Sequence, residues 1–108
     1  MIPEITAPEL DAWRKDASRA APHVVDVREP WEFDRAHLDD TTLIPMREIP
    51  SRIAELPAGD DLVLMCHHGS RSAQVAAWLS RNGFARVHNL TGGIDAWSRL
   101  VDPAVPRY

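Results

Sequence analysis

The stretch Leu62-Val63-Leu64-Met65-Cys66-His67-His68-Gly69-Ser70-Arg71-Ser72 decides the fold of this chain. Its first four residues are all apolar, which is typical of a strand buried on both faces of a parallel sheet. A short polar loop follows Cys66, and the sequence from Ser72 to Leu79 predicts a helix. The order strand, tight loop, helix places Cys66 at the carboxyl end of the strand. Because ligands of open α/β sheets bind in the crevice at that end, we expect the loop to carry the functional site.

The composition of this loop favours an anion. The first turn of a helix leaves several backbone N–H groups without partners, and the helix dipole adds partial positive charge there. A loop that curls around the Cys66 sulfur can direct those amides inward as an anion-binding nest, and Gly69 allows the turn. Arg71 adds a planar, forked cation suited to an oxyanion. These surroundings favour the ionised thiol, so we expect Cys66 to be a thiolate nucleophile at neutral pH.

The remaining chain alternates between strand and helix patterns. We expect further strands at 2–5 (an edge strand, because it contains Pro3), 23–28, 41–45 and 86–90. We expect helices from Thr6 onward, over 30–35, over 46–56 and over 94–100, and an extended, loosely held segment at 102–106. The pattern predicts one domain, residues 1–108, of the α/β class: an open parallel sheet of about five strands flanked by helices on both faces.

Composition excludes several classes of function. The chain has 108 residues, a net charge of -4 and no basic block, which argues against nucleic-acid binding. No apolar run approaches the roughly 20 residues that cross a bilayer, and the N-terminus lacks a signal-peptide pattern. A single cysteine excludes an intramolecular disulfide. We therefore expect a cytoplasmic protein without membrane association.

The loop residues carry alternatives. Cys66 would be a buried core thiol if it only packed, but the residues after it do not continue a core. Arg71 is either a surface arginine or an anion clamp, and its place at the helix start favours the clamp. Of His67 and His68, at most one is expected to face a substrate, because adjacent loop residues point in different directions. A metal held by Cys66, His67 and His68 is the sharper alternative, but contiguous residues chelate poorly, so we predict no metal and no cofactor.

Polar and aromatic residues outside the loop have simpler interpretations. We expect Asp26 and Arg28, at the end of a neighbouring strand, to form a structural ion pair that braces the loops. His37 is interpreted as a loop histidine with its hydrogen bonds satisfied. Four tryptophans at helical positions are expected to serve packing: Trp13, Trp31, Trp78 and Trp97.

At these residues the chain resembles the rhodanese family of sulfurtransferases. The resemblance covers nearly the whole length and is carried by motifs in a fixed order and spacing. The motifs are Val24-Val25-Asp26-Val27-Arg28-Glu29, Trp31-Glu32-Phe33, Ala36-His37-Leu38 leading to Ile44-Pro45, the loop from Cys66 to Ser72, Asn82-Gly83-Phe84, and the stretch from Leu90 to Trp97. The chain departs from the family at Ala36, where glycine is usual, and at Asp39-Asp40, where Pro-Gly is usual.

The resemblance implies persulfide chemistry. Cys66 would take the outer sulfur of thiosulfate or a persulfide donor, hold it as a cysteine persulfide and pass it to a thiol, to cyanide or to a partner protein. Cys66 and Arg71 would be catalytic, and the substrate would be bound by the loop residues His67, His68, Gly69, Ser70, Arg71 and Ser72. Because the chain has no second cysteine, the sulfur must leave to an external acceptor.

Two rival functions follow from the same fold. Cysteine-dependent phosphatases and arsenate reductases have a similar loop, but the dual-specificity phosphatases place one residue more between the cysteine and the arginine. Here four residues separate Cys66 from Arg71, and the smaller ring suits a sulfur atom better than a tetrahedral phosphate. The other rival is a non-catalytic or sulfur-carrier module, which the presence of both Cys66 and Arg71 argues against only in part.

Overall fold

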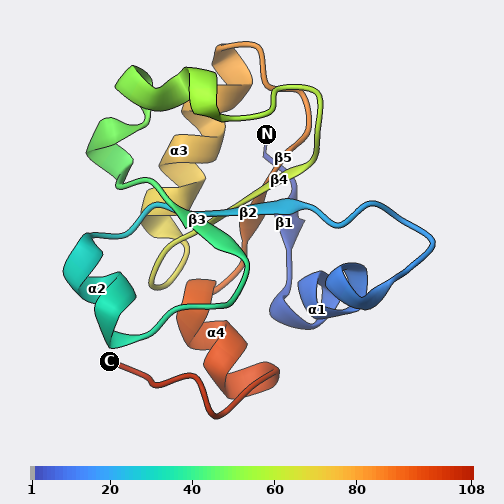
Figure 1. Ribbon diagram of the computed structural model, residues 1–108, viewed down its shortest axis with the longest axis vertical. Coiled ribbons are helices and arrows are strands. Elements are labelled where there is room, and N and C mark those ends of the chain that lie inside the picture. The colour runs from blue at the N-terminus through green and yellow to red at the C-terminus, as the bar shows by residue number, and fades with distance from the viewer. Residues whose placement is uncertain (1) are drawn as a thin grey trace.

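A computed structural model describes residues 2–108 (Figure 1). Within these residues, five strands form one parallel sheet in the order β1-β5-β4-β2-β3. The strands are β1 (Glu4–Ile5), β2 (His23–Asp26), β3 (Thr41–Leu43), β4 (Leu62–Met65) and β5 (Val87–Leu90). The strand that leads to Cys66 is therefore central, and β1 lies at an edge, which confirms both predictions.

The helices begin and end where the sequence provides caps. They are α1 (Ala7–Lys15), α2 (Pro30–Arg35), α3 (Ser70–Arg81) and α4 (Gly93–Leu100). Thr6 caps α1: its hydroxyl accepts the Glu9 amide at 3.2 Å, and the Glu9 carboxylate accepts the Thr6 amide at 2.9 Å. After α3, Gly83 has a φ of 94° and the Phe84 amide donates to the Leu79 carbonyl, as expected of a glycine-terminated helix.

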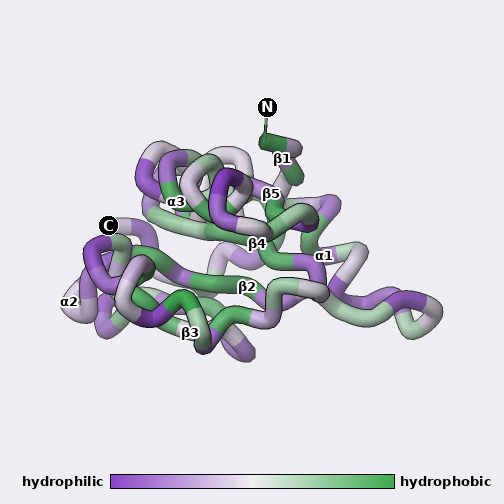
Figure 2. Tube along the Cα trace, turned by 90° about the horizontal axis from the view of Figure 1, so that it is seen from above, coloured by the Kyte–Doolittle hydropathy of each residue, from purple (hydrophilic) through white to green (hydrophobic). Residues whose placement is uncertain are grey.

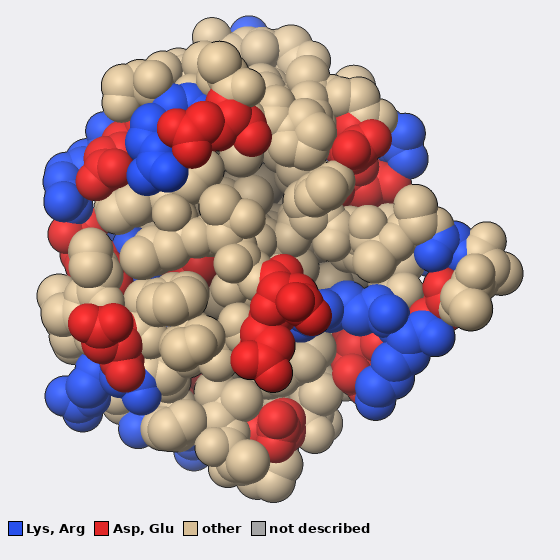
Figure 3. All heavy atoms as spheres, viewed as in Figure 1, with Lys and Arg blue, Asp and Glu red and all other residues tan. Residues whose placement is uncertain are grey.

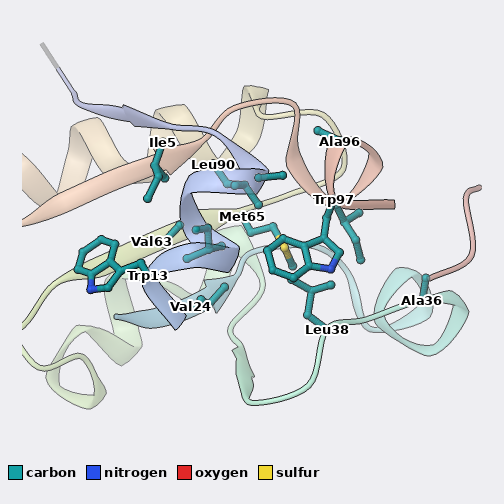
Figure 4. Packing of buried hydrophobic residues seen from close by; sticks show 13 residues of the cluster. Ile5, Trp13, Val24, Ala36, Leu38, Val63, Met65, Leu90, Ala96 and Trp97 are labelled. Atoms are coloured by element: carbon teal, nitrogen blue, oxygen red, sulfur yellow. The ribbon is translucent and has the colours of Figure 1, made fainter. Parts of the chain in front are cut away.

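Alternation along the strands divides the core into two layers. Val24, Val63 and Met65 face α1 and α4, whereas Val25, Leu62 and Leu64 face α3. Figure 4 shows the first layer, where the Trp97 ring of α4 lies over Met65 and Leu38. Figure 2 shows β2 and β4 as apolar segments inside a more polar envelope. Helices on both faces thus confirm the predicted open parallel α/β sheet.

The stretch 46–56 does not form the single helix that the sequence predicted. Two 3₁₀ helices, η1 (Met46–Glu48) and η2 (Pro50–Glu55), occupy this stretch. Pro50 lacks the amide that a continuous α-helix needs, and Arg52 has non-helical backbone angles of -115° and 15°. The stretch nevertheless contributes to the core, because Ile49 and Leu56 are buried in the layer that contains α3.

The extended conformation predicted at 102–106 is also wrong, although most of these residues are exposed. After α4 the chain turns, and Val101, Val105 and Tyr108 pack against the core. The Arg107 guanidinium donates to the Asp95 carboxylate at 2.9 Å, which adds a polar anchor. Figure 1 shows the segment running back past α4 to end beside α2. Residues 101–108 therefore form part of the wall near the carboxyl ends of the strands.

The surface carries charge of both signs. On the face shown in Figure 3, acidic and basic side chains lie beside one another. Several form ion pairs, such as Arg86 with Asp61 at 2.5 Å and Arg52 with Glu48 at 3.0 Å. None of the helices within residues 2–108 is long and apolar enough to cross a membrane.

Candidate functional site

Cys66 follows the last residue of β4 and is 1% exposed. Its sulfur accepts a hydrogen bond from the Gly69 amide at 3.1 Å and lies 3.3 Å from the Ser72 hydroxyl. Among residues 2–108 these are the two polar groups within hydrogen-bond distance of the sulfur. Gly69 turns the chain with a φ of 106°, a left-handed conformation that favours glycine. Of the several inward amides expected, only that of Gly69 contacts the sulfur in the described residues, together with the hydroxyl of Ser72 in the first turn of α3.

Asn89 on β5 holds this loop in place through hydrogen bonds of its side chain. Its side-chain amide donates to the Gly69 carbonyl at 3.2 Å and to the Glu4 carboxylate at 3.1 Å, which fixes the amide orientation. Its oxygen therefore faces the Ser72 hydroxyl, at 2.6 Å. A hydroxyl carries one proton, so Ser72 donates either to Asn89 or to the sulfur of Cys66. The shared proton is available to a negative charge that develops on the sulfur.

Helix α4 braces the other side of the loop. The Ile94 amide donates to the Cys66 carbonyl at 2.9 Å, and the Asp95 amide donates to the His67 carbonyl at 3.1 Å. At Gly93 an added Cβ would lie 2.4 Å from the Cys66 carbonyl oxygen, and the φ there is 59°. Only glycine allows this approach. The loop is therefore positioned by α4 as well as by its own turn.

Arg71 lies at the opening of the site, but its fork is engaged. Its two terminal nitrogens donate to the two carboxylate oxygens of Glu32, at 2.6 and 2.9 Å. Glu32 comes from α2 and is 4% exposed, whereas the Arg71 side chain is 33% exposed. The hydrogen bonds from Arg71, with a further one from Tyr108, lower the pKa of Glu32 to about 2. The same pairing raises the pKa of Arg71.

A buried ion pair lies behind Glu32. Arg28 and Asp26 are fully buried and joined by a 2.6 Å bond, which confirms the predicted structural pair. The remaining terminal nitrogen of Arg28 donates to the Tyr108 hydroxyl at 2.8 Å, and that hydroxyl donates to Glu32 at 2.7 Å. Burial is the largest influence on Tyr108 and raises its pKa to about 12. A continuous hydrogen-bonded chain thus joins Asp26 to Arg71.

The two loop histidines stack rather than diverge. The His67 ring lies between His68 and Tyr108, with both centroid distances at 3.9 Å. Burial, and then the neighbouring His68, lower the pKa of His67. Within residues 2–108, its Nε2 is the one buried side-chain polar atom without a hydrogen-bond partner. His68 is exposed, and Ser70, the first residue of α3, is exposed as well.

The metal set considered from the sequence is not the one that assembles. Donor atoms of His67, His68 and Asp95 lie within 4.8 Å of one another, and Cys66 is not among them. Asp95 is already paired with Arg99 and Arg107, at 3.0 and 2.9 Å. The Asp95 carboxylate is therefore already neutralised by two guanidinium groups, and the absence of a metal stays a prediction.

An open cavity of about 490 Å³ lies beside Arg71, at the edge of the site, and Cys66 is not among its lining residues. Its lining includes Val27 after β2, Met46 and Pro50 from the 3₁₀ region, and the charged side chains of Glu29, Arg47 and Arg71. Arg47 pairs with Glu29, at 2.6 Å for one of the two contacts. A second cavity continues from Met46 and Pro50 along α3. The edge of the sheet predicted to bind a ligand therefore has an opening beside Arg71.

Residues outside the loop mostly follow the predictions. The His37 ring contacts the Phe33 carbonyl at 3.0 Å and stacks on the Phe33 ring, as expected of a satisfied loop histidine. Trp13 and Trp97 are buried, and Trp78 is partly buried. Trp31 is 59% exposed, so its predicted packing role is wrong. It lies on the outer side of α2, where it has an edge-on contact with Tyr108.

Three residues of the site were not predicted: Glu32, Asn89 and Tyr108. Glu32 lies in one of the motifs quoted above. As the third residue of the helix that begins at Pro30, it indicated only a role in capping that helix. Asn89 interrupts an apolar strand, which was a signal of a buried polar contact. Tyr108 carries no local signal, because its partners lie 76 and 80 residues away.

Comparison with known proteins agrees with the resemblance. The sequence model of the protein family described as rhodanese-like domain matches residues 6–100. The chain belongs to this family. It is 38% identical over 105 residues to a protein of Allochromatium vinosum named sulfurtransferase, with 97% of this chain and 96% of that protein covered. Other relatives are named thiosulfate sulfurtransferase GlpE.

Larger relatives and a solved structure extend the comparison. A chloroplast protein of Arabidopsis thaliana, named rhodanese-like/PpiC domain-containing protein 12, is 42% identical over 89 residues. The aligned region covers 79% of this chain and 30% of the plant protein. The crystal structure of a rhodanese-like domain protein from Staphylococcus aureus superposes with a TM-score of 0.85 and 28% identity, covering 99% of both chains.

Proposed function

We propose that this protein is a sulfurtransferase that carries sulfane sulfur as a persulfide on Cys66. The Cys66 thiolate attacks the outer sulfur of thiosulfate, a new S–S bond forms, and the old S–S bond breaks with its electron pair leaving on sulfite. An acceptor thiolate or cyanide then attacks the outer sulfur of the persulfide. The product is a new persulfide or thiocyanate, and the Cys66 thiolate is regenerated.

The observation that carries this proposal is the pair of donors at the Cys66 sulfur. A persulfide anion needs stabilisation at the sulfur, and the Gly69 amide at 3.1 Å and the Ser72 hydroxyl at 3.3 Å supply it. Cys66 itself is 1% exposed. A persulfide extends the reactive atom by about 2 Å, the length of an S–S bond. This extension lets a nearly buried cysteine present sulfur to an acceptor at the opening.

The residues at the opening support small anionic donors. Arg71 keeps three N–H donors that are not used by the Glu32 pair, and it lines the cavity of about 490 Å³. With a single cysteine in the sequence, the acceptor is external: a thiol, cyanide in an assay, or a sulfur-accepting protein. Relatives named sulfurtransferase, thiosulfate sulfurtransferase and sulfur carrier support the same substrate class.

The loop geometry favours this chemistry over phosphoryl transfer. Four residues separate Cys66 from Arg71, and the Arg71 fork points to Glu32 rather than across the ring. A phosphoryl group in the ring would need donors for its three equatorial oxygens. The loop amides offer one contact to the sulfur, from Gly69. We therefore expect turnover of thiosulfate and negligible hydrolysis of an aryl phosphate.

Mass spectrometry of the intact protein tests the proposal. Incubation with thiosulfate should add the mass of one sulfur atom, on the peptide that contains Cys66, and cyanide should remove it with release of thiocyanate. The Cys66→Ala variant should show neither the adduct nor turnover. Turnover by Cys66→Ala, or aryl phosphatase activity in the wild type, would overturn the assignment. A persulfide that forms but passes to no small acceptor would instead identify a sulfur-carrier module.

The setting of this activity follows from the same chemistry. Residues from β1 to Tyr108 contribute to the site, so we infer that residues 1–108 act as one domain. A lone thiol that must stay reduced between turnovers suits a reducing compartment, and we infer the cytoplasm.

A further inference from the structure

Residues 101–108 bring Tyr108 into the site, although sequence patterns gave it no role. Its hydroxyl is shared between Arg28 at 2.8 Å and Glu32 at 2.7 Å. Its ring stacks on His67 at 3.9 Å, with an angle of 5° between the planes. Neither Arg28 nor Asp26 behind it is exposed to solvent. Tyr108 is therefore held at a fixed point beside the acid that pairs with Arg71.

We propose that Tyr108 is a positioning residue for sulfur transfer: its hydroxyl holds the Glu32 carboxylate in the orientation that fixes Arg71 at the mouth of the site. This inference rests on the proposed function, because it takes Arg71 as the group that meets the anionic donor.

The direction of each hydrogen bond supports this role. Arg28 can only donate, so the Tyr108 oxygen accepts from it and the hydroxyl proton is directed to Glu32. Oε2 of Glu32 then receives Tyr108 and one terminal nitrogen of Arg71 together, at 2.7 and 2.9 Å. The carboxylate cannot rotate without breaking both contacts. Arg71 is consequently held by a rigid partner, although its own side chain is 33% exposed.

The expected effect of losing the hydroxyl is weaker donor binding rather than loss of chemistry. In Tyr108→Phe the ring can still stack on His67, but Glu32 loses one of its anchors. Arg71 then gains freedom that thiosulfate binding must remove. We expect KM for thiosulfate to rise by about three- to tenfold, the effect of one hydrogen bond, with kcat changed by less than about twofold.

A remote hydroxyl provides the matched control. Thr41 on β3 donates to the Leu38 carbonyl at 3.0 Å, away from Arg71, and Thr41→Val removes that bond without altering the site. A merely structural role for Tyr108 would lower the active fraction in both variants and leave KM unchanged. An unchanged KM in Tyr108→Phe, or an equal change in Thr41→Val, would overturn the proposal.

A second measurement does not depend on activity. In protein labelled with ¹⁵N, the Arg71 Nε–H should give a sharp, slowly exchanging signal in the wild type and a broadened, faster-exchanging one in Tyr108→Phe. Identical Arg71 signals in the two proteins would contradict the positioning role even if neither protein transferred sulfur. A wild type that transfers no sulfur but loses this order in Tyr108→Phe would contradict the proposed function alone.

Discussion

Replacing Glu32 by glutamine tests the pair at the mouth of the site. Glutamine keeps the size and shape of the side chain but removes its charge. It also replaces one accepting carboxylate oxygen by a donating amide group, which then faces another donor. Arg71 is then left without a counter-ion and loses one of its two acceptors in either orientation of the amide. The second lost contact is that of the Tyr108 hydroxyl or that of the Glu29 backbone amide. We therefore expect Glu32→Gln to destabilise the fold at neutral pH.

The lowered pKa of Glu32 sets the magnitude. A change from 4.5 to about 2 corresponds to about 3 kcal/mol of stabilisation of the charged form in the folded state. The Arg71 side chain is 33% exposed, so solvent screens part of this interaction. We expect the free energy of unfolding to fall by about 2 kcal/mol at pH 7.

The pH dependence carries the sign of the effect. Because the pKa of Glu32 is lower in the folded than in the unfolded protein, its stabilisation is fully present above the unfolded value of 4.5. It is lost as the pH falls from there toward 2. The difference in stability between wild type and Glu32→Gln should therefore be constant from pH 7 to about pH 5 and shrink at lower pH.

Denaturant unfolding at several pH values, with the same change at an exposed acid as control, provides the measurement. Glu55 also forms a two-bond pair with an arginine, Arg52, at 2.8 and 2.9 Å, but its side chain is 52% exposed. We expect Glu55→Gln to have the smaller effect on unfolding. The reasoning would be refuted if the two variants lost equal stability at pH 7, or if the Glu32→Gln difference stayed constant down to pH 2.5.

Two further substitutions test the anion site and the loop support. For Arg71→Ala we expect kcat/KM on thiosulfate to fall by an amount equivalent to about 1–3 kcal/mol. Arg71→Lys should recover part of this loss, since a point charge lacks the fork of the guanidinium. Steady-state kinetics measure both effects, and an unchanged kcat/KM in Arg71→Ala would remove Arg71 from the mechanism. For Gly93→Ala we expect about 3 kcal/mol of destabilisation, because the new Cβ meets the Cys66 carbonyl and the backbone is left-handed. Gly59→Ala, where nothing lies within 4 Å, is the control, and equal melting temperatures for these two glycine variants would contradict the packing argument.

The sheet and the position of Cys66 were predictable because they depend on local signals. An apolar run such as 62–65 is typical of a central strand of a parallel sheet, where both faces are buried. The residue that follows it must then lie at the carboxyl end of that strand. Caps at Thr6 and Gly83 fixed helix ends for the same reason. Spacing alone misjudged the stretch 46–56, since a helical face is also compatible with two 3₁₀ turns around Pro50.

The partners of the loop were not predictable from local patterns. Glu32 and Arg71 are 39 residues apart, and Tyr108 is 76 residues from Glu32. Only the folded sheet brings α2, α3 and residues 101–108 to one edge. A charged residue in a short helix has the same sequence pattern whether it faces solvent or pairs with an arginine of another helix. The interpretation of Arg71 as a free clamp followed from the loop alone and missed the acid that shares it.

The charge balance of the site limits how a donor is recognised. Asp26 with Arg28 and Glu32 with Arg71 place two acids beside two bases, so their fields largely cancel at a distance. Attraction of a distant anion is then weak, and recognition acts at contact, through the Gly69 amide, the Ser72 hydroxyl and the free edge of Arg71. Such contacts suit a persulfide, whose charge lies on the sulfur that moves. In the proposed reaction we expect local dipoles to stabilise the persulfide, and we expect the lack of a net positive field to favour release of the product sulfite.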